Sequence, residues 1–124
     1  MSNTIKYKNH TFIKYISREK INNKNNELSN ILNADYNDKN PVFIGVLNGC
    51  VYFMMDILKD VNFSYEISFV KISSYEDLGK TTIKSYNYDN LNIKNRNVLI
   101  FEDIIDSGET INHLLEEIIN KKPK

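Results

Sequence analysis

With 124 residues, the chain is long enough for one domain built around a single modest core. Its 16 Lys and Arg residues balance its 16 Asp and Glu residues, so the formal net charge is zero and gives no indication of a nucleic-acid or membrane partner. The single cysteine, Cys50, excludes an intrachain disulfide. The sequence shows no signal peptide and no apolar run near the roughly 18 residues of a membrane span. These features together predict a cytoplasmic protein.

The first predicted element is a helix over residues 18–36, which Ser17 can cap. The asparagine-rich run 22–26 inside this helix is interpreted as a solvated stretch. The apolar face is predicted to contain four residues at roughly helical spacing: Ile21, Leu28, Ile31 and Leu32. A turn over residues 37–41 follows the helix.

A continuous apolar run over residues 42–47 is typical of a strand buried on both faces, as in a parallel sheet. Asn48-Gly49 breaks this strand. A second helix is then predicted from the spacing of Val51, Met54, Met55, Leu58 and Val61. We interpret Met54 and Met55 as core residues.

The second half of the chain is predicted to contain a hairpin, a strand and a final helix. Alternating side chains predict a strand over 65–73, a turn over 77–80 and a returning strand over 81–88. Residues 98–101 form the next predicted strand. A final helix is predicted over 110–121 from the apolar stripe of Ile111, Leu114, Leu115, Ile118 and Ile119.

This order of elements predicts an α/β fold in a single domain over residues 1–124, with a mostly parallel sheet flanked by helices. Ligands of such sheets bind beyond the carboxyl ends of the strands. Two loops follow strand ends on that rim, namely residues 47–49 and residues 102–110. We therefore expect the functional site to involve both loops.

Residues 106–110 have the features of an anion cradle. Free backbone N–H groups and the helix dipole at the start of the final helix favour a negative charge there. Gly108 allows close approach or a positive φ, and Ser107 and Thr110 add hydroxyl donors. Since the loop has neither the lysine of a P-loop nor a GxGxxG pattern, the expected ligand is a phosphate monoester held without a lysine.

Two adjacent acidic residues, Glu102 and Asp103, would repel a bare phosphate. They are explained if they bind a sugar diol, a Mg²⁺ ion or both, and a sugar phosphate meets both demands. Asp106 lies between this pair and the cradle, where it is placed to reach a reacting group. Taken alone, Asp106-Ser107-Gly108 is a common turn sequence, so the specificity comes from the complete order of strand, acidic pair, loop and helix.

Three segments resemble the hypoxanthine-guanine phosphoribosyltransferases. Val98–Thr110 resembles the phosphoribosyl-pyrophosphate (PRPP) motif of that family nearly residue for residue. Residues 44–49 resemble its pyrophosphate loop, and residues 69–75 resemble the strand that leads to its mobile loop. The resemblance implies a phosphoribosyltransferase-type, Rossmann-like core with a mobile strand hairpin near residues 74–82.

The resemblance implies an activity in purine salvage. Hypoxanthine or guanine, a 6-oxopurine base, would displace pyrophosphate from PRPP and give IMP or GMP, with Mg²⁺ as cofactor. Glu102 and Asp103 would bind the ribose hydroxyls and hold Mg²⁺ directly or through water. Asp106 would be the general base. The implied partners are thus PRPP, the purine and pyrophosphate, without nucleic acid or membrane.

The resemblance also implies three groups of binding residues. The 5′-phosphate would be held by Asp106, Ser107, Gly108, Glu109 and Thr110. Pyrophosphate would contact Leu47, Asn48 and Gly49, often through a cis peptide that presents a backbone N–H. Ser74 and Tyr75 would close over the pyrophosphate as a mobile lid.

The chain departs from the family pattern in two ways. Asn48 stands where many members have Lys, so positive charge is lost while the backbone N–H remains. The family also continues past the final helix with another core strand, the residues that recognise the purine and an Asp for a second Mg²⁺. We therefore expect a C-terminally truncated chain with an incomplete core, an exposed sheet edge and marginal stability. A homo-oligomer is expected of the full-length protein.

Other functions remain open at this point. The chief alternative from another class is a non-catalytic, nucleotide-sensing regulator on the same fold, which would need a basic face that the neutral charge balance does not support. A further alternative is an inactive remnant that binds PRPP or a nucleotide. A receiver-like signalling domain would need its acidic pair after the first strand. Cys50, at a predicted helix start, could have a lowered thiol pKa, although a small buried residue is the commoner role.

Overall fold

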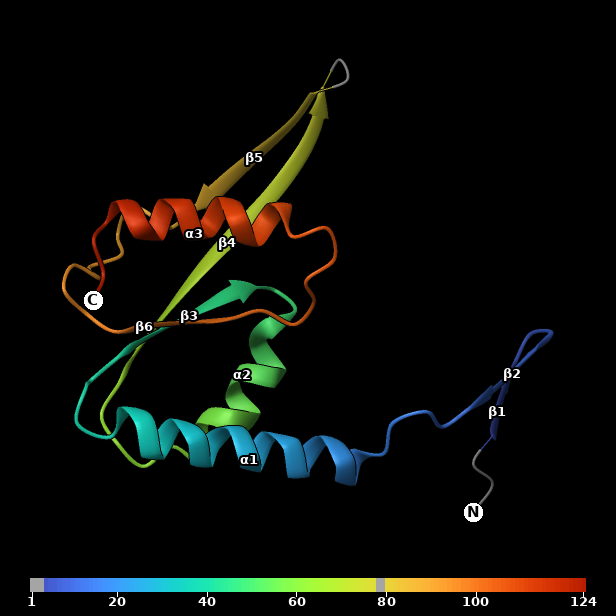
Figure 1. Cartoon of the computed structure of the whole chain (residues 1–124). Coiled ribbons are helices and arrows are strands. Elements are labelled where there is room, and N and C mark those ends of the chain that lie inside the picture. Colours follow the sequence, from blue (N-terminus) through green and yellow to red (C-terminus); the bar gives the residue numbers. More distant parts are fainter. Residues whose placement is uncertain (1–3, 78–79) are drawn as a thin grey trace.

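A four-stranded mixed sheet forms the centre of the molecule, with helices on both of its faces (Figure 1). The computed structural model describes residues 4–77 and 80–124, and it describes no side chains for residues 74–81. The sheet strands are β3 (Val42–Leu47), β4 (Glu66–Asp77), β5 (Lys80–Tyr86) and β6 (Val98–Phe101). In the order β5-β4-β3-β6, β4 and β6 run parallel to β3, and β5 runs antiparallel to β4. The predicted α/β fold with a mostly parallel sheet is confirmed.

The helices are α1 (Arg18–Tyr36), α2 (Cys50–Leu58) and α3 (Glu109–Asn120). Helix α2 contacts β3 and β6, and α1 contacts α2, so these two helices cover one face of the sheet. Helix α3 covers the opposite face and contacts β5 (Figure 1). Among the described residues, no helix is both long and apolar enough to cross a membrane.

Strand β3 is buried on both faces, as its continuous apolar run predicts. Val42, Ile44 and Val46 belong to the core cluster under α3. Phe43 belongs to the cluster under α1 and α2, where the Phe101 ring lies 5.5 Å away between centroids. Because side chains alternate along a strand, a strand between two helical layers must be apolar at every position. The core of the molecule is therefore centred on β3.

The first helix has the predicted limits and the predicted cap. Ser17 Oγ accepts a hydrogen bond from Lys20 N at 3.1 Å, which satisfies one of the free donors of the first turn. Its buried face differs from the prediction, because the fully buried residues are Asn25, Ser29 and Leu32. Ile21 and Ile31 are 48% and 46% exposed, so the predicted apolar face is wrong at these two positions.

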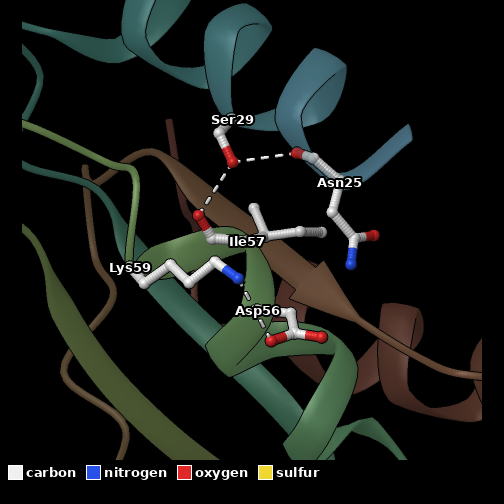
Figure 2. Close-up of polar contacts among 5 residues, drawn as sticks. All are labelled: Asn25, Ser29, Asp56, Ile57 and Lys59. Carbon is white, nitrogen blue, oxygen red and sulfur yellow. Dashed lines mark hydrogen bonds and ion pairs between the residues drawn. The ribbon is translucent and has the colours of Figure 1, made fainter. Parts of the chain in front are cut away.

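The reason for this difference is the way in which α2 crosses α1 (Figure 2). Ser29 Oγ lies 2.8 Å from the carbonyl oxygen of Ile57, near the end of α2, and 2.9 Å from that of Asn25. The small hydroxyl lets the two helices approach and supplies a donor to a carbonyl near a helix end, where partners are scarce. Asn25, predicted to be solvated, is therefore covered by this contact.

Two further helical predictions are corrected in part. Helix α2 ends at Leu58, so Val61 lies beyond it, and Met55 is 39% exposed whereas Met54 is fully buried. In α3, the buried part of the predicted stripe consists of Leu114 and Ile118. The other side of the stripe is uncovered: Leu115 is 39% exposed and Ile119 is 65% exposed. Each helix contacts the sheet along a narrower face than its apolar pattern spans.

The predicted hairpin is present with shifted ends. Strand β4 continues to Asp77 rather than ending at residue 73, and β5 ends at Tyr86 rather than at residue 88. Residues 78 and 79 of the predicted turn lie outside the described part of the chain. Among the described strands, β6 lies at the edge of the sheet opposite to β5, and its residues are half-buried or buried.

A second, two-stranded antiparallel sheet was not predicted. It consists of β1 (Thr4–Tyr7) and β2 (His10–Ile13), and it projects away from the main body (Figure 1). Every residue of both strands is exposed. Its alternating residues are few and its turn lacks glycine or proline, so the sequence carries little signal for it.

Candidate functional site

The two predicted loops meet at one edge of the sheet. Strands β3 and β6 are adjacent and parallel, from Val42 opposite Val98 to Gly45 opposite Phe101, so the loops that follow them start at the same edge. A Cβ atom on Gly49 would lie 2.1 Å from Asp103 Oδ2 and 2.4 Å from Asp103 Cγ. The Asp103 carboxylate therefore rests directly on Gly49, and only glycine leaves room for it.

The first of these loops carries the cis peptide bond that the resemblance implies, between Leu47 and Asn48. Asn48 and Gly49 are exposed, and Gly49 is the N-cap of α2 without a side-chain cap. The free N–H groups at the start of α2 therefore face this rim as well. The loop offers backbone donors to a ligand rather than side-chain charge.

The acidic pair is partly covered, and its surroundings disfavour the charged form of Glu102. Glu102 is half-buried and Asp103 is exposed, and Asp103 N donates a hydrogen bond to Glu102 Oε1 at 3.0 Å. Burial, followed by the side chain of Asp103, raises the pKa of Glu102 above its ordinary value. A cation or a pair of hydroxyl donors beside Glu102 would stabilise its carboxylate form. The acidic pair therefore suits a divalent ion or a sugar diol.

Cys50 lies beneath this pair and is completely buried. Burial raises the pKa of its thiol, and Glu102 and Asp103 raise it further. The hypothesis of an activated thiol at a helix start is therefore wrong, and Cys50 is a small buried residue. Its Sγ would lie 2.9 Å from a Cβ placed on Gly45, so it fills the space beside that glycine.

The second loop encloses a pocket of about 130 Å³ at the start of α3. It is lined by Glu102, Ile104, Ile105, Asp106, Ser107, Gly108, Thr110 and Ile111. Gly108 has φ of 86°, in the left-handed region that favours glycine, and it is the N-cap of α3 without a side-chain cap. Ser107 Oγ accepts from Glu109 N at 3.3 Å. The remaining first-turn donors of α3 are thus directed at a pocket, as an anion site requires.

Two lining residues were missed by the sequence analysis. Ile104 and Ile105 are 74% and 64% exposed, although they are large and apolar. They sit in the loop between β6 and α3, where neither strand nor helix periodicity explains them. An apolar pair in a loop that otherwise contains acidic and small polar residues is the signal that marks them.

The predicted lid residues can be placed only by their backbone. Ser74 and Tyr75 lie in β4, opposite Ile83 and Thr82 of β5. Their side chains fall outside the described residues, so their predicted role over the pyrophosphate stays a prediction.

The residues present fit a Mg²⁺ ion that takes some of its ligands from a substrate. Carboxylate oxygens are suitable hard donors, and Glu102 and Asp103 supply them at the rim. Within the described residues, no group of three or more His, Cys, Asp or Glu side chains is arranged to hold a metal ion by itself. Water and substrate oxygens would have to complete the coordination, which is the usual situation of Mg²⁺.

Comparison with known proteins identifies the fold family. The phosphoribosyl transferase domain matches residues 16–124. The chain belongs to the phosphoribosyl transferase family. The resemblance inferred from its motifs is thereby confirmed, and the matched residues include both rim loops.

Several curated phosphoribosyltransferases are similar to this chain. The hypoxanthine-guanine phosphoribosyltransferase of Streptococcus mutans is 42% identical over 102 residues, which cover 79% of this chain and 56% of that protein. The Bacillus subtilis enzyme of the same name is 38% identical over 114 residues, with 88% and 62% covered. A bifunctional protein TilS/HprT of Listeria innocua is 38% identical over 111 residues, with 88% and 17% covered.

Solved phosphoribosyltransferase structures share the fold. A hypoxanthine phosphoribosyltransferase from Staphylococcus aureus superposes with a TM-score of 0.77 at 33% identity, covering 86% of this chain and 59% of that one. A hypoxanthine-guanine-xanthine phosphoribosyltransferase gives a TM-score of 0.69 at 38% identity, with 83% and 58% covered. The chain thus spans between half and two thirds of the length of these single-function relatives.

Proposed function

We propose that this phosphoribosyl transferase chain binds PRPP and acts in purine salvage, transferring the 5-phosphoribosyl group to hypoxanthine or guanine. The observation that carries the proposal is the contact of Asp103 with Gly49, beside the pocket at the start of α3. Two backbone-rich loops and an acidic pair then surround one volume. That combination suits a ligand with a phosphate, a sugar diol and a pyrophosphate, which PRPP contains.

The 5′-phosphate is assigned to Asp106, Ser107, Gly108, Glu109 and Thr110, of which all but Glu109 line the pocket at the start of α3. The N–H groups and the dipole at the start of α3 favour a dianion there, and the hydroxyls add donors. Gly108 supports this role, because its left-handed conformation turns the loop into the helix without a side chain over the pocket. The exposed isoleucines of this loop, Ile104 and Ile105, are available to shield one side of the ligand.

The ribose hydroxyls and Mg²⁺ are assigned to Glu102 and Asp103. Burial, followed by the side chain of Asp103, raises the pKa of Glu102, and two hydroxyl donors or one divalent cation would stabilise its carboxylate form. When bound, Mg²⁺ supplies neutralisation of the pyrophosphate leaving group. Glu102 and Asp103 orient the sugar, and the contact of Asp103 with Gly49 fixes the distance between the sugar site and the loop 47–49.

Pyrophosphate is assigned to Leu47, Asn48 and Gly49, and Asp106 is assigned the role of general base near the purine. Backbone N–H groups of the first loop stabilise the charge that develops as pyrophosphate leaves. Ser74 and Tyr75 are assigned to a lid that excludes water during the transfer. We place the reaction in the cytoplasm and expect the active form to be a homo-oligomer.

The proposal is tested by incubating the chain with PRPP, Mg²⁺ and radiolabelled hypoxanthine or guanine. Formation of IMP or GMP that is lost in Asp103→Ala and kept in Glu116→Ala supports it; Glu116 is exposed on α3, away from the pocket lining. PRPP binding without product would instead support the alternative of an inactive PRPP-binding remnant. Absence of PRPP binding would contradict both.

A further inference from the structure

Helix α3 carries a polar stripe beside its buried residues, and this stripe faces β5. His113, Glu117 and Lys121 are spaced by four residues, so they lie on one side of the helix. Glu117 is the centre of the contacts. Its Oε2 accepts a hydrogen bond from Ser85 Oγ at 2.5 Å, its Oε1 lies 3.5 Å from His113 Nε2, and its backbone oxygen accepts from the hydroxyl of Tyr88.

Lys121, one turn after Glu117, also links the end of α3 to the segment that follows β5. Its Nζ donates to the carbonyl oxygens of Asp89 and Leu91, at 3.2 Å each, and lies 4.4 Å from the centre of the Tyr88 ring. The side chain of Glu117 is only 24% exposed, so its bond to Ser85 is partly shielded from water. A short hydrogen bond between a hydroxyl and a carboxylate is about twice as strong as a neutral one.

These contacts bear on the site because α3 begins there. Glu117 lies eight residues after Glu109, which corresponds to about 12 Å along the helix axis. The apolar contacts of Leu114 and Ile118 hold α3 on the sheet but are non-directional, and they leave the rotation and slide of the helix poorly defined. The N-cap residue Gly108 has no side chain to anchor the start of α3, where Ser107 Oγ accepts one long bond of 3.3 Å from Glu109 N. The bond to Ser85 is therefore a directional restraint on where the first-turn N–H groups point.

The restraint also reaches β5 close to the predicted lid. Ser85 pairs with Ile72 of β4, and two residues further along β5, Ile83 pairs with Ser74. Among the described strands, β5 is an edge strand that pairs with β4 alone, so contacts outside the sheet also determine its position. Glu117 thus joins the helix of the pocket to the strand hairpin through one side chain.

We propose that Glu117 is a positioning residue: by holding Ser85, it fixes the orientation of α3 and thereby the placement of the phosphate-binding start of that helix relative to the Gly49–Asp103 contact. This role rests on the proposed function, because it assumes that the pocket at residues 106–110 takes the phosphate of PRPP. Glu117 is not among the residues that line the pocket.

The test compares Glu117→Ala with Glu116→Ala, a matched control that removes the same charge from an exposed position of the same helix. The measured quantity is the Kd for PRPP in the presence of Mg²⁺, determined by calorimetry on folded protein. Glu117→Ala is expected to raise the Kd about tenfold, the factor that corresponds to one lost charge-assisted hydrogen bond. Glu116→Ala is expected to leave it unchanged. A purely structural role would shift the urea midpoint without changing the Kd of the folded chain.

Smaller substitutions keep the test decisive if Glu117→Ala does not fold. Glu117→Gln keeps an acceptor for Ser85 and is expected to bind PRPP like the unaltered chain, whereas Ser85→Ala is expected to bind as weakly as Glu117→Ala. Adding Ser85→Ala to Glu117→Ala should not weaken binding further, since the bond between the two side chains is already lost. Equal Kd values for Ser85→Ala and the unaltered chain would overturn the proposal.

Failure of the proposed function gives a different pattern. If the unaltered chain does not bind PRPP, the restraint itself is still measured by amide hydrogen exchange in α3 and β5. Glu117→Ala is then expected to speed exchange in both elements, relative to Glu116→Ala. Unchanged exchange would show that Glu117 restrains neither element.

Discussion

Strand β3 is the parallel neighbour of β6, so it lies close to the loop that follows β6, but the strand and the loop have opposite surroundings. Phe43 and Ile44 in β3 are 0% exposed, whereas Ile104 and Ile105 in the loop are 74% and 64% exposed. The strand contributes buried apolar area and no side chain that lines the pocket. The loop contributes hydrogen-bond donors and carboxylates but little buried area. Stability and binding are thus assigned to neighbouring but separate residues, so substitutions should affect one without the other.

The largest expected effect is on stability, at Phe43 in the buried strand β3. Phe43→Ala removes a ring that contacts Phe63, Tyr65 and Phe101, and it should lower the free energy of unfolding by about 3–5 kcal/mol. Urea denaturation measures this. Phe12→Ala in the exposed hairpin is the matched control and should change the free energy by less than about 0.5 kcal/mol. Similar losses at both positions would contradict the placement of the core.

The second effect should appear in binding and hardly at all in stability. Gly49→Ala places a Cβ where the Asp103 carboxylate lies, so the carboxylate must move into solvent, where it is already exposed. PRPP affinity should fall at least about tenfold, with a nearly unchanged urea midpoint. Calorimetric titration of Gly49→Ala, Asp103→Ala and the double variant should give non-additive losses. Additive losses would mean that the two loops act independently.

A smaller effect is expected where α1 and α2 meet. Ser29→Ala leaves the buried carbonyl oxygen of Ile57 without its side-chain donor, and the free energy of unfolding should fall by about 1–3 kcal/mol. PRPP binding should be unaffected, because this contact belongs to the fold and lies away from the pocket lining. Ser64→Ala, at an exposed position, is the control. A loss no greater than that of the control would show that the bond from Ser29 to Ile57 does not stabilise the contact between α1 and α2.

The smallest predicted effect is a pH-dependent change in stability at Glu102, a residue of the binding site. Burial and Asp103 raise the pKa of Glu102 in the folded chain, so its carboxylate form is disfavoured relative to the unfolded chain. Above the folded pKa, Glu102→Gln should therefore be more stable than the unaltered chain. The difference should shrink as the pH falls through the folded pKa and vanish below the ordinary value of 4.5. Urea midpoints across this range test the sign, and a destabilised Glu102→Gln at neutral pH would contradict it.

The sequence predicts β3, β6 and the start of α1 well, because each has a local physical signal. β3 is apolar at every position, β6 precedes an acidic pair and a glycine loop, and Ser17 caps α1. Burial of Ser29 and exposure of Met55 and Ile31 were not predictable. Periodicity identifies side chains that could be covered, but which of them are covered depends on how α2 crosses α1.

The candidate site likewise has features that the sequence predicts and features that it does not. Its two loops could be placed at one rim, since parallel neighbouring strands end together. The direct contact between Asp103 and Gly49 could not be predicted, because the order of residues contains no distance between loops. The sequence does not indicate a role for Ile104 and Ile105, because apolar residues usually belong to the core, and the fold shows them exposed beside the pocket.

The central claim is that the two loops together bind PRPP, and calorimetric titration of PRPP into the chain with Mg²⁺ tests it most directly. The account predicts saturable binding of one PRPP per site, lost in Asp103→Ala and in Gly49→Ala and retained in Glu116→Ala. No binding by a chain that unfolds cooperatively in urea, or equal binding by all the variants, would contradict it.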